Sequence, residues 1–294
     1  MMKEINCIPM DMELGEGPIW NRNRQSWCWF DILNSTLYEL PFGESTPELH
    51  QLPIMASAMA TIETNGLLLA SDTSIATYDL VSKELGEVIK LNLPSDMRTN
   101  DGGMGFDGRF WFSSMQKSPS EAKGAIYSLS PNFALKKHID GIVIPNTMVW
   151  DTKMRGLMLS DSFHQQTYLY PYEGNQFKSD ELSNLIIDLK QTNSTPDGGA
   201  LDINGNMWVA LWGGHKVICV DPLGEIIDEI DLPVPQPSSC CFGGEHYNHL
   251  IITSAKEGLT KADLDKYPLS GSVFIVELDV KGIAIPGFLP EKTC

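Results

Sequence analysis

RFWFSSM, at residues 109–115, is one of six short apolar or aromatic stretches that recur along the chain. The others are SWCWFDI (26–32), GLLLASD (66–72), GLMLSDS (156–162), NMWVALW (206–212) and HLIITSA (249–255). They begin about 40 to 50 residues apart, which is the length of one four-stranded propeller blade. Most are followed, after a polar turn, by a second strand such as STLYEL (35–40). The sequence therefore predicts an all-β protein, a six-bladed β-propeller.

Six units of about 45 residues would occupy nearly all of the 294 residues and leave no linker for a second domain. We therefore expect one domain spanning residues 1–294. A β-sandwich is the alternative, but it would not require such even spacing. A closed ring needs its ends joined, so we expect the segment Lys3–Pro9 to pair beside strands of the last blade. Only Thr260–Lys266 and Glu181–Leu189 have helix-like patterns.

The charge of the chain restricts its partners. Acidic residues number 38 and basic residues 21, giving a net charge of −17. Such a field repels nucleic-acid phosphates and anionic lipid surfaces, so neither partner is expected. The sequence has no secretory h-region and no apolar run of about 18 residues, which favours a soluble, cytoplasmic protein. The six scattered cysteines indicate free thiols rather than a disulfide scaffold or a zinc ribbon.

Three short stretches each place an oxygen ligand beside Gly or Pro at the start of an expected strand. They are LGEGPIW (14–20), IPNT (144–147) and TPDGG (195–199), and they fall in different blades. Segments from all blades converge on the axis of a propeller, where polar residues distant in sequence can meet. For each stretch alone, an ordinary turn residue or cap remains the alternative.

These stretches belong to a longer set of motifs that resembles the gluconolactonase, senescence marker protein (regucalcin) and luciferin-regenerating enzyme family. The matching segments are LGEGPIW, RTNDGG (98–103) followed by GRFWFSSM (108–115), PNTMVW (145–150), TPDGGALDINGNMWVALWGG (195–214) and SSCCFGGEHYNHLIITSAKEGL (238–259). The resemblance implies a central divalent metal held in the axial funnel by Glu16, Asn146 and Asp197. An all-oxygen set suits Ca²⁺, Mg²⁺ or Mn²⁺, and family members also accept Zn²⁺, so Ca²⁺ or Zn²⁺ is the expected ion.

The resemblance also implies that Arg98 and Asn100 bind substrate. An Arg fork and an amide can hold the hydroxyls of a sugar lactone. The alternative is that Arg98 pairs with Asp101 on the rim. Met115 matches a family methionine, although Ser113 and Ser114 precede it in place of the usual residues. The acidic substrate-contacting residue that follows in some members has no clear match here, and the nearest positions are Ser118 and Glu121.

The implied activity is metal-dependent hydrolysis of a sugar-acid lactone to the free acid, in the manner of a gluconolactonase of carbohydrate metabolism. Asp197 is the expected catalytic base and would return the proton to the leaving alkoxide. One alternative is an esterase or phosphotriesterase-like hydrolase that uses the same metal. Another is a calcium-binding regulatory propeller without catalysis. The expected partner is a small-molecule sugar lactone, and the expected state is a monomer or weak homo-oligomer.

Other chemistries have little support in the sequence. It contains no G-x-S-x-G, H-E-x-x-H or P-loop motif. The histidines do not fall in metal-ligand spacing, and we expect all six to be surface or packing residues: His50, His138, His164, His215, His246 and His249.

Overall fold

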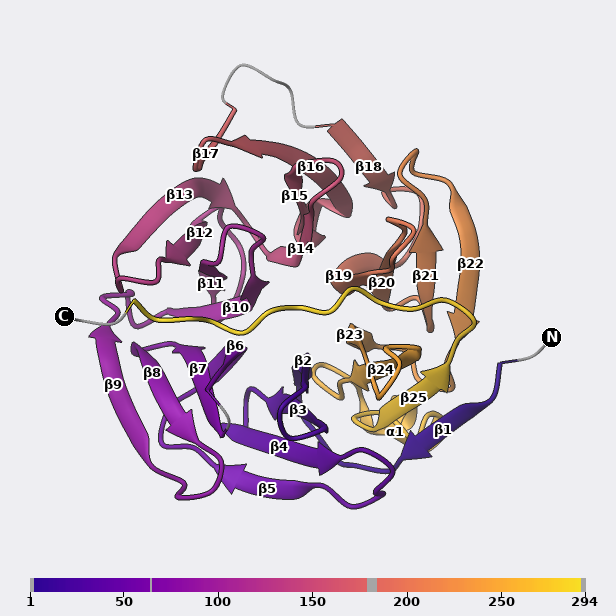
Figure 1. Cartoon of the computed structure of the whole chain (residues 1–294). Helices are drawn as coiled ribbons and strands as arrows, with labels where there is room; N and C mark the ends of the chain where they lie inside the picture. Colours follow the sequence, from indigo (N-terminus) through magenta and orange to yellow (C-terminus); the bar gives the residue numbers. More distant parts are fainter. Residues whose placement is uncertain (1–2, 64, 179–183, 292–294) are drawn as a thin grey trace.

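The computed structural model of this protein describes residues 3–63, 65–178 and 184–291. Within them, the strands form six antiparallel sheets arranged in a ring around a central axis (Figure 1). Each sheet is a blade whose first strand lies nearest the axis. This arrangement confirms the predicted six-bladed β-propeller.

The first three blades are simple four-stranded meanders. Blade 1 comprises β2 (Gly15–Asn21), β3 (Ser26–Asp31), β4 (Thr36–Pro41) and β5 (Glu48–Gln51). Blade 2 comprises β6 (Ala56–Ile62), β7 (Gly66–Ser71), β8 (Ser74–Asp79) and β9 (Leu85–Lys90). Blade 3 comprises β10 (Met97–Met104), β11 (Phe110–Gln116), β12 (Gly124–Leu129) and β13 (Leu135–Ile142).

Among the last three blades, blade 5 keeps the simple meander, whereas blades 4 and 6 depart from it. Blade 4 comprises β14 (Pro145–Asp151), β15 (Gly156–Asp161), the 3-10 turn η1 (Ser162–His164), β16 (Gln166–Glu173), β17 (Gln176–Phe177) and β18 (Asn184–Asp188). Blade 5 comprises β19 (Thr195–Leu201), β20 (Met207–Trp212), β21 (Lys216–Val220) and β22 (Ile226–Asp231). Blade 6 comprises β23 (Pro237–Gly243), β24 (His249–Ser254), β25 (Val273–Glu277) and β1 (Ile5–Ile8).

Blade 6 is built from both ends of the chain. β1 pairs antiparallel with β25, with Ile5 opposite Val276 and Ile8 opposite Val273. In Figure 1 the indigo β1 lies along the outer side of the yellow β25. The backbone groups of β25 that would otherwise form an exposed edge are thereby satisfied.

The two helix-like patterns have different outcomes. Thr260 caps the short helix α1 (Lys261–Lys266), and its hydroxyl and the Asp263 carboxylate form a capping box. The pattern at Glu181–Leu189 is wrong over residues 184–188, because these residues form β18 and pair with β16. Adjacent Ile186 and Ile187 favour a strand, and the open edge of β16 supplies hydrogen-bond partners. Residues 181–183 lie outside the described residues.

Large aromatic side chains fill the space between blades. Trp27, Trp29, Trp111, Phe110 and Phe112, from the second strands of blades 1 and 3, are fully buried. They belong to the repeated stretches from which the fold was predicted. Across the described ranges, no helix is long and apolar enough to span a membrane.

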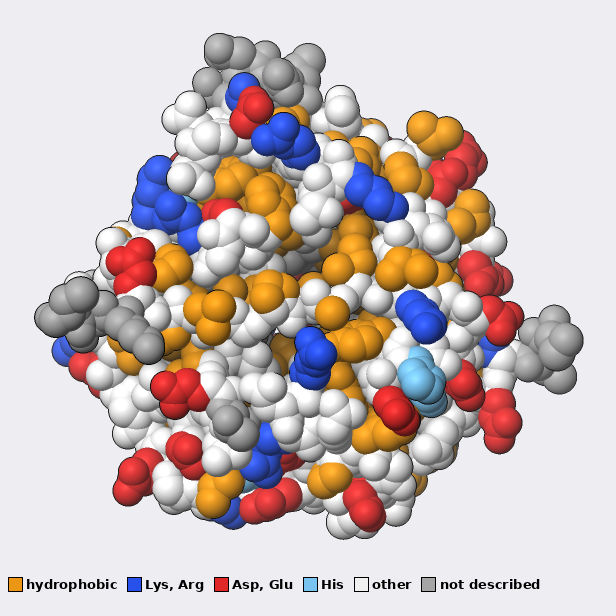
Figure 2. All heavy atoms as spheres, in the orientation of Figure 1, with side chains coloured by type: hydrophobic (Ala, Val, Ile, Leu, Met, Phe, Trp, Pro, Cys, Tyr) orange, Lys and Arg blue, Asp and Glu red, His pale blue; other side chains and the backbone are white. Residues whose placement is uncertain are grey.

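The segment after β25 crosses one face of the ring (Figure 1). Its backbone forms hydrogen bonds with Leu201 in blade 5, Thr61 in blade 2 and Pro131 in blade 3. Figure 2 shows this face, on which apolar side chains gather around the centre. The segment therefore links blades that are distant in sequence across one end of the channel.

Candidate functional site

The innermost strands all deviate from regular pairing near one end of the channel. Each shows a register shift against the second strand of its own blade, at Glu16/Ile19, Ala56/Ala58, Thr99/Gly102, Asn146/Val149, Pro196/Gly199 and Pro237/Ser239. A bulge redirects side chains and is common beside active sites. Asn100 and Asp197 lie inside such shifts, and Glu16 and Asn146 begin them. The bulges thus coincide with four of the five predicted site residues.

Two of these bulges contain a residue with a left-handed backbone. Gly17 follows Glu16 with φ of 57°, and Thr147 follows Asn146 with φ of 52°. This conformation costs little for glycine but is strained for a β-branched residue such as Thr147. Hydrogen bonds hold Thr147 in place, since its hydroxyl donates to the Asp197 carbonyl and accepts from Ser160 at 2.7 Å. The turn after Asn146 is therefore fixed against the strand that contains Asp197.

A hydrogen-bond chain connects three of the predicted site residues across blades 3 and 4. Arg98 Nη1 donates to Asn100 Oδ1 at 2.7 Å, and Asn100 Nδ2 donates to Asn146 Oδ1 at 2.7 Å. Asn146 Nδ2 in turn donates to Ser162 Oγ at 2.9 Å, and Ser162 Oγ donates to the carbonyl of Pro196 at 2.6 Å. All three predicted residues are buried. The chain runs from the predicted substrate contacts to the residue before Asp197.

Arg98 does not form the alternative ion pair with Asp101 on the rim. It is buried, and its Nη1 donates to the carbonyl of Thr99 and the amide oxygen of Asn100. Asp101 instead accepts backbone N–H groups from Gly102 at 2.7 Å and Met148 at 2.9 Å. Burial lowers the pKa of Arg98, and the charges of Glu257, Glu16 and Asp197 oppose this effect. Arg98 is therefore an inward-facing cation within an acidic environment.

The two predicted carboxylate ligands are buried in a negatively charged environment. Burial raises the pKa of Glu16 well above its ordinary value, and the charges of Asp197 and Asp101 raise it further. Burial and then the charge of Asp101 likewise raise the pKa of Asp197, whereas Arg98 lowers it. Like charges brought together out of water are costly unless a cation compensates them.

The donor set fits a hard divalent cation. Among the described residues, no hydrogen-bond partner reaches Asp197 Oδ1, although this oxygen is buried. Asn146 Oδ1 accepts one hydrogen bond and retains a second lone pair. With Glu16, these groups would supply two carboxylates and one amide oxygen, a set that suits Ca²⁺ and leaves positions for water and substrate.

Two acidic residues near this site were not assigned a role from the sequence. Asp101 raises the pKa of both Glu16 and Asp197, so it contributes to the same negative field. Glu257 interacts electrostatically with Arg98, and its own pKa is raised by burial. Both occur in the matched motifs RTNDGG and SAKEGL. The sequence could have drawn attention to both residues through these motifs. It could not show that their side chains act on the buried cluster.

The region after Met115 provides no acidic contact within the buried cluster. Met115 is buried and lies opposite Arg98 across the β10–β11 pair. Ser118 and Glu121 are both exposed, and Glu121 forms an ion pair with Lys123 at 2.8 Å. Neither position is a buried counterpart of the family's acidic substrate contact.

A cavity of about 150 Å³ lies farther along the inner strands, beneath the segment that follows β25. Its lining includes Trp20, Met148, Leu201 and Ile283, together with Asp101. The five predicted site residues do not line it. Because this space is mostly apolar, we assign the chemistry to the buried polar cluster and not to the cavity.

The fold and this cluster together define a class: a six-bladed β-propeller with buried oxygen donors and an arginine in its channel. Residues 14–256 match the family model described as "SMP-30/Gluconolactonase/LRE-like region", and the chain belongs to this family. The expected family is thus confirmed. Regucalcin of Danio rerio is 28% identical over 287 residues, covering 95% of this chain and 96% of the relative. A putative sugar lactone lactonase of Rhizobium meliloti (strain 1021) is 29% identical over 276 residues, covering 94% of each.

Solved structures show the same architecture. A calcium-binding protein, regucalcin, from Agrobacterium tumefaciens str. C58 is 28% identical, with a TM-score of 0.89 and 95% of each chain covered. A gluconolactonase from Xanthomonas campestris has a TM-score of 0.75 at 16% identity, covering 94% of this chain and 90% of its own. At that identity the second likeness concerns the fold alone.

Proposed function

We propose that this protein is a metal-dependent lactonase that opens a sugar-acid lactone to the free acid. The observation that carries the proposal is the buried placement of Glu16, Asn146 and Asp197 next to the Arg98–Asn100 pair. Two buried carboxylates with raised pKa values favour a divalent cation between them. Within the described part of the chain, Arg98 uses only Nη1 in its hydrogen bonds, so its other guanidinium N–H groups can donate to a ligand rich in hydroxyls, and Asn100 Oδ1 keeps a lone pair that can accept from one.

Each protein group has a distinct part in the proposed reaction. A divalent metal bound by Glu16, Asn146 and Asp197 would polarise the lactone carbonyl. Arg98 and Asn100 orient the substrate by hydrogen bonds to its hydroxyls. Asp197 takes a proton from the attacking water while the new C–O bond forms at the carbonyl carbon. The ring C–O bond then breaks, and the proton passes from Asp197 to the leaving alkoxide.

The names of the relatives support this substrate class, and they also support a calcium-binding role without catalysis. The Rhizobium meliloti relative is a putative sugar lactone lactonase, which favours catalysis on lactones. The Agrobacterium tumefaciens structure is described as a calcium-binding protein, which supports calcium as the ion and keeps a non-catalytic calcium-binding role as the second candidate.

The test is hydrolysis of a panel of sugar lactones, including gluconolactone, by protein stripped of metal and resupplied with Ca²⁺, Mg²⁺, Mn²⁺ or Zn²⁺. Proton release measured at constant pH should appear only after metal is added. An aryl ester and an organophosphate in the same panel test the esterase and phosphotriesterase-like alternative. Tight metal binding without turnover of any substrate would overturn the lactonase proposal and favour the non-catalytic calcium-binding role.

A further inference from the structure

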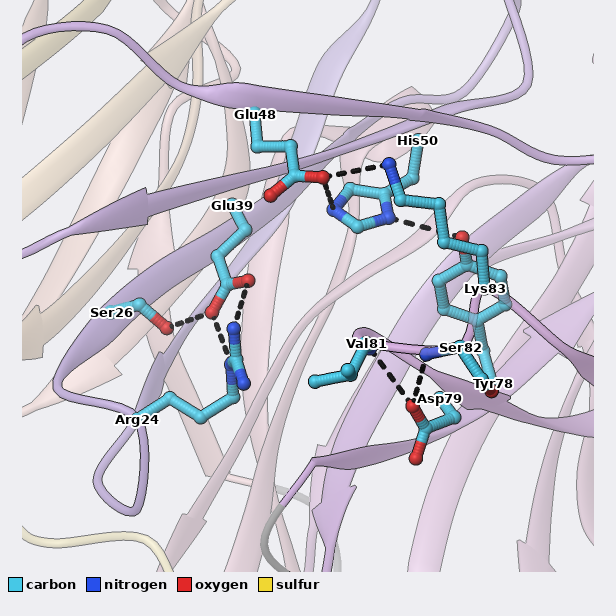
Figure 3. Close-up of polar contacts among 10 residues, drawn as sticks. All are labelled: Arg24, Ser26, Glu39, Glu48, His50, Tyr78, Asp79, Val81, Ser82 and Lys83. Atoms are coloured by element: carbon cyan, nitrogen blue, oxygen red, sulfur yellow. Dashed lines mark hydrogen bonds and ion pairs between the residues drawn. The ribbon is translucent and has the colours of Figure 1, made fainter.

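A second cluster of potential metal ligands, whose side chains Figure 3 shows, lies on β4 and β5, the two strands of blade 1 farthest from the channel-lining strand β2. It consists of Glu39 from β4 and of Glu48 and His50 from β5. One ligand atom from each lies within 4.8 Å of the other two. Glu39 pairs directly with Glu48, and His50 lies two residues farther along β5. Since side chains alternate along a strand, this register places all three on one face of the sheet.

His50 has a buried nitrogen without a partner. The residue is 1% exposed, and within the described part of the chain nothing hydrogen-bonds to its Nε2. The nearest carboxylate oxygen, Glu48 Oε1, lies 3.8 Å away, which is too long for a hydrogen bond. A buried polar atom left in this state carries a free-energy cost. In Figure 3 this nitrogen faces the Glu48 carboxylate.

The other side of the imidazole ring is fixed by the neighbouring blade. His50 Nδ1 lies 3.0 Å from the hydroxyl of Tyr78, which comes from β8 of blade 2. In the tautomer in which Nδ1–H donates a hydrogen bond to the Tyr78 hydroxyl, Nε2 presents a lone pair towards the two carboxylates. Metal-binding histidines are commonly oriented by such a contact at the other ring nitrogen. Burial also lowers the pKa of His50, which favours the neutral form that binds metal.

Each carboxylate has a cationic partner but retains capacity for a further ligand. Arg24 donates to Glu39 Oε1 at 2.6 Å and to Oε2 at 2.9 Å, and Ser26 donates to Oε1 at 2.6 Å. A carboxylate oxygen has two lone pairs, so one on Glu39 Oε2 remains. Lys83 pairs with Glu48 Oε1 at 2.7 Å, and this is the same oxygen that faces His50. Lys83 would therefore compete with a metal ion for this oxygen of Glu48.

We infer that Glu39, Glu48 and His50 form a second divalent-metal site, which takes Zn²⁺ or a similar transition ion. One imidazole nitrogen and two carboxylate oxygens, with water as a fourth ligand, suit tetrahedral zinc rather than calcium, which prefers six or more oxygens. Ligands at zinc distances lie roughly 3.3 Å apart, so the 3.8 Å gap closes with a small rotation of Glu48. Glu48 is about half exposed and can make this movement.

The site would join two blades at the edge of the ring. β5 is the outermost strand of blade 1, whereas Tyr78 and Lys83 belong to blade 2. Binding of Zn²⁺ releases Lys83 from Glu48, while Arg24 stays on Glu39. The bound ion would then stabilise the blade 1–blade 2 junction without involving the channel.

The test uses the full chain with its central site saturated with Ca²⁺, followed by titration with Zn²⁺. Affinity is measured by competition with a chromophoric chelator, and the histidine rings are observed by ¹⁵N NMR. The His50 signal, assigned from its absence in His50→Gln, should shift on addition of Zn²⁺. His50→Gln should lower Zn²⁺ affinity more than tenfold, and Tyr78→Phe should lower it about tenfold. Lactone hydrolysis should be unchanged in both variants.

A substitution of Lys83 separates a real metal site from a chance cluster of side chains. Lys83→Ala removes the competitor for Glu48 Oε1 and should raise Zn²⁺ affinity several-fold. The matched control is Lys123→Ala, because Lys123 forms an ion pair of similar length with Glu121, at 2.8 Å. The control should leave Zn²⁺ affinity unchanged. An unshifted His50 signal, or a Lys83→Ala variant with the same or weaker affinity, would overturn the site. Glu48→Gln should also weaken binding, so the test does not depend on the folding of His50→Gln.

Discussion

The side-chain amide of Asn100 donates to that of Asn146 at 2.7 Å, so a predicted substrate residue of blade 3 directly orients a predicted metal ligand of blade 4. Asn100 Nδ2 also donates to the carbonyl of Pro145 at 3.0 Å. These two bonds hold the Asn146 amide with one lone pair of its oxygen still available. If these two residues have the proposed roles, substrate binding and metal binding should be coupled through Asn100.

We expect Asn100→Ala to weaken Ca²⁺ binding about tenfold in addition to raising KM for the lactone. Removal of a group that orients a metal ligand typically costs 10- to 100-fold in affinity. Calorimetric Ca²⁺ titration measures the first effect and steady-state kinetics the second. Asn132→Ala, in the turn before β13, is the control. Unchanged Ca²⁺ affinity in Asn100→Ala would show that Asn146 needs no such support.

Asp197→Asn should keep kcat at least about a hundredfold below wild type even at saturating metal, because it removes the proposed base. Metal occupancy is confirmed separately by calorimetry. The metal-free variant should also be more stable than metal-free wild type, since one buried negative charge is removed. Full recovery of kcat with excess metal would assign Asp197 the role of a ligand only.

Arg98→Ala should raise KM for the lactone more than it weakens metal binding, because a cation cannot be a ligand of another cation. Its loss also removes the positive charge that lowers the pKa values of Glu16 and Asp197. Arg98→Lys keeps the charge but loses the planar fork, so it should preserve metal affinity and still raise KM. Normal kinetics of Arg98→Ala on every lactone would exclude Arg98 from the site.

Gly17→Ala should destabilise the fold by about 1–3 kcal/mol and displace Glu16. Gly17 has φ of 57°, and an added Cβ would lie 2.8 Å from the carbonyl oxygen of Ser57. Gly103→Ala on β10 is the control, because an added Cβ there meets nothing within 4 Å in the part of the chain that the structure describes. Chemical denaturation measures both variants. Equal stability of the two would contradict the strain assigned to position 17.

His138 should make stability fall as the pH falls below about 6.5. Burial lowers its pKa to about 4, with help from Lys136 and Arg109 and opposition from Asp107. Between these pKa values the unfolded chain binds a proton that the folded ring does not, so folding loses stability until about pH 4. Solvent screens this partly buried ring, so the effect is about 1 kcal/mol.

The variant His138→Gln lacks this titration and should lose less stability than wild type between pH 7 and pH 5. Thermal unfolding at both pH values provides the comparison. The variant His164→Gln, at an exposed histidine paired with Asp161 at 2.8 Å, is the matched control. Parallel losses in wild type and His138→Gln would remove His138 as the source.

The propeller was predictable because its second strands, such as RFWFSSM, combine a regular period with bulky apolar residues that must be buried. The strand β18 was not predictable from the sequence, because its residues are partly helix-like. Their conformation is determined by pairing with β16. The motifs suggested Glu16, Asn146 and Asp197 as expected ligands, but the bulges at which these buried residues lie depend on strand register. The sequence predicts His50 as a surface or packing residue, and it is buried against Tyr78. Its proximity to Glu39 was not predictable, because it arises only when β4 and β5 pair.

The pairing of Ile5 with Val276 also affects the order of events during synthesis. β1 leaves the ribosome before its partner β25, which follows only after more than 260 intervening residues. Until then blade 6 lacks two of its strands, and the neighbouring blades 1 and 5 have no completed blade between them. Closing so long a loop is a slow, non-local step. A nascent chain stalled before Val273 would therefore leave β1 as an unpaired strand, and unpaired strand edges favour aggregation.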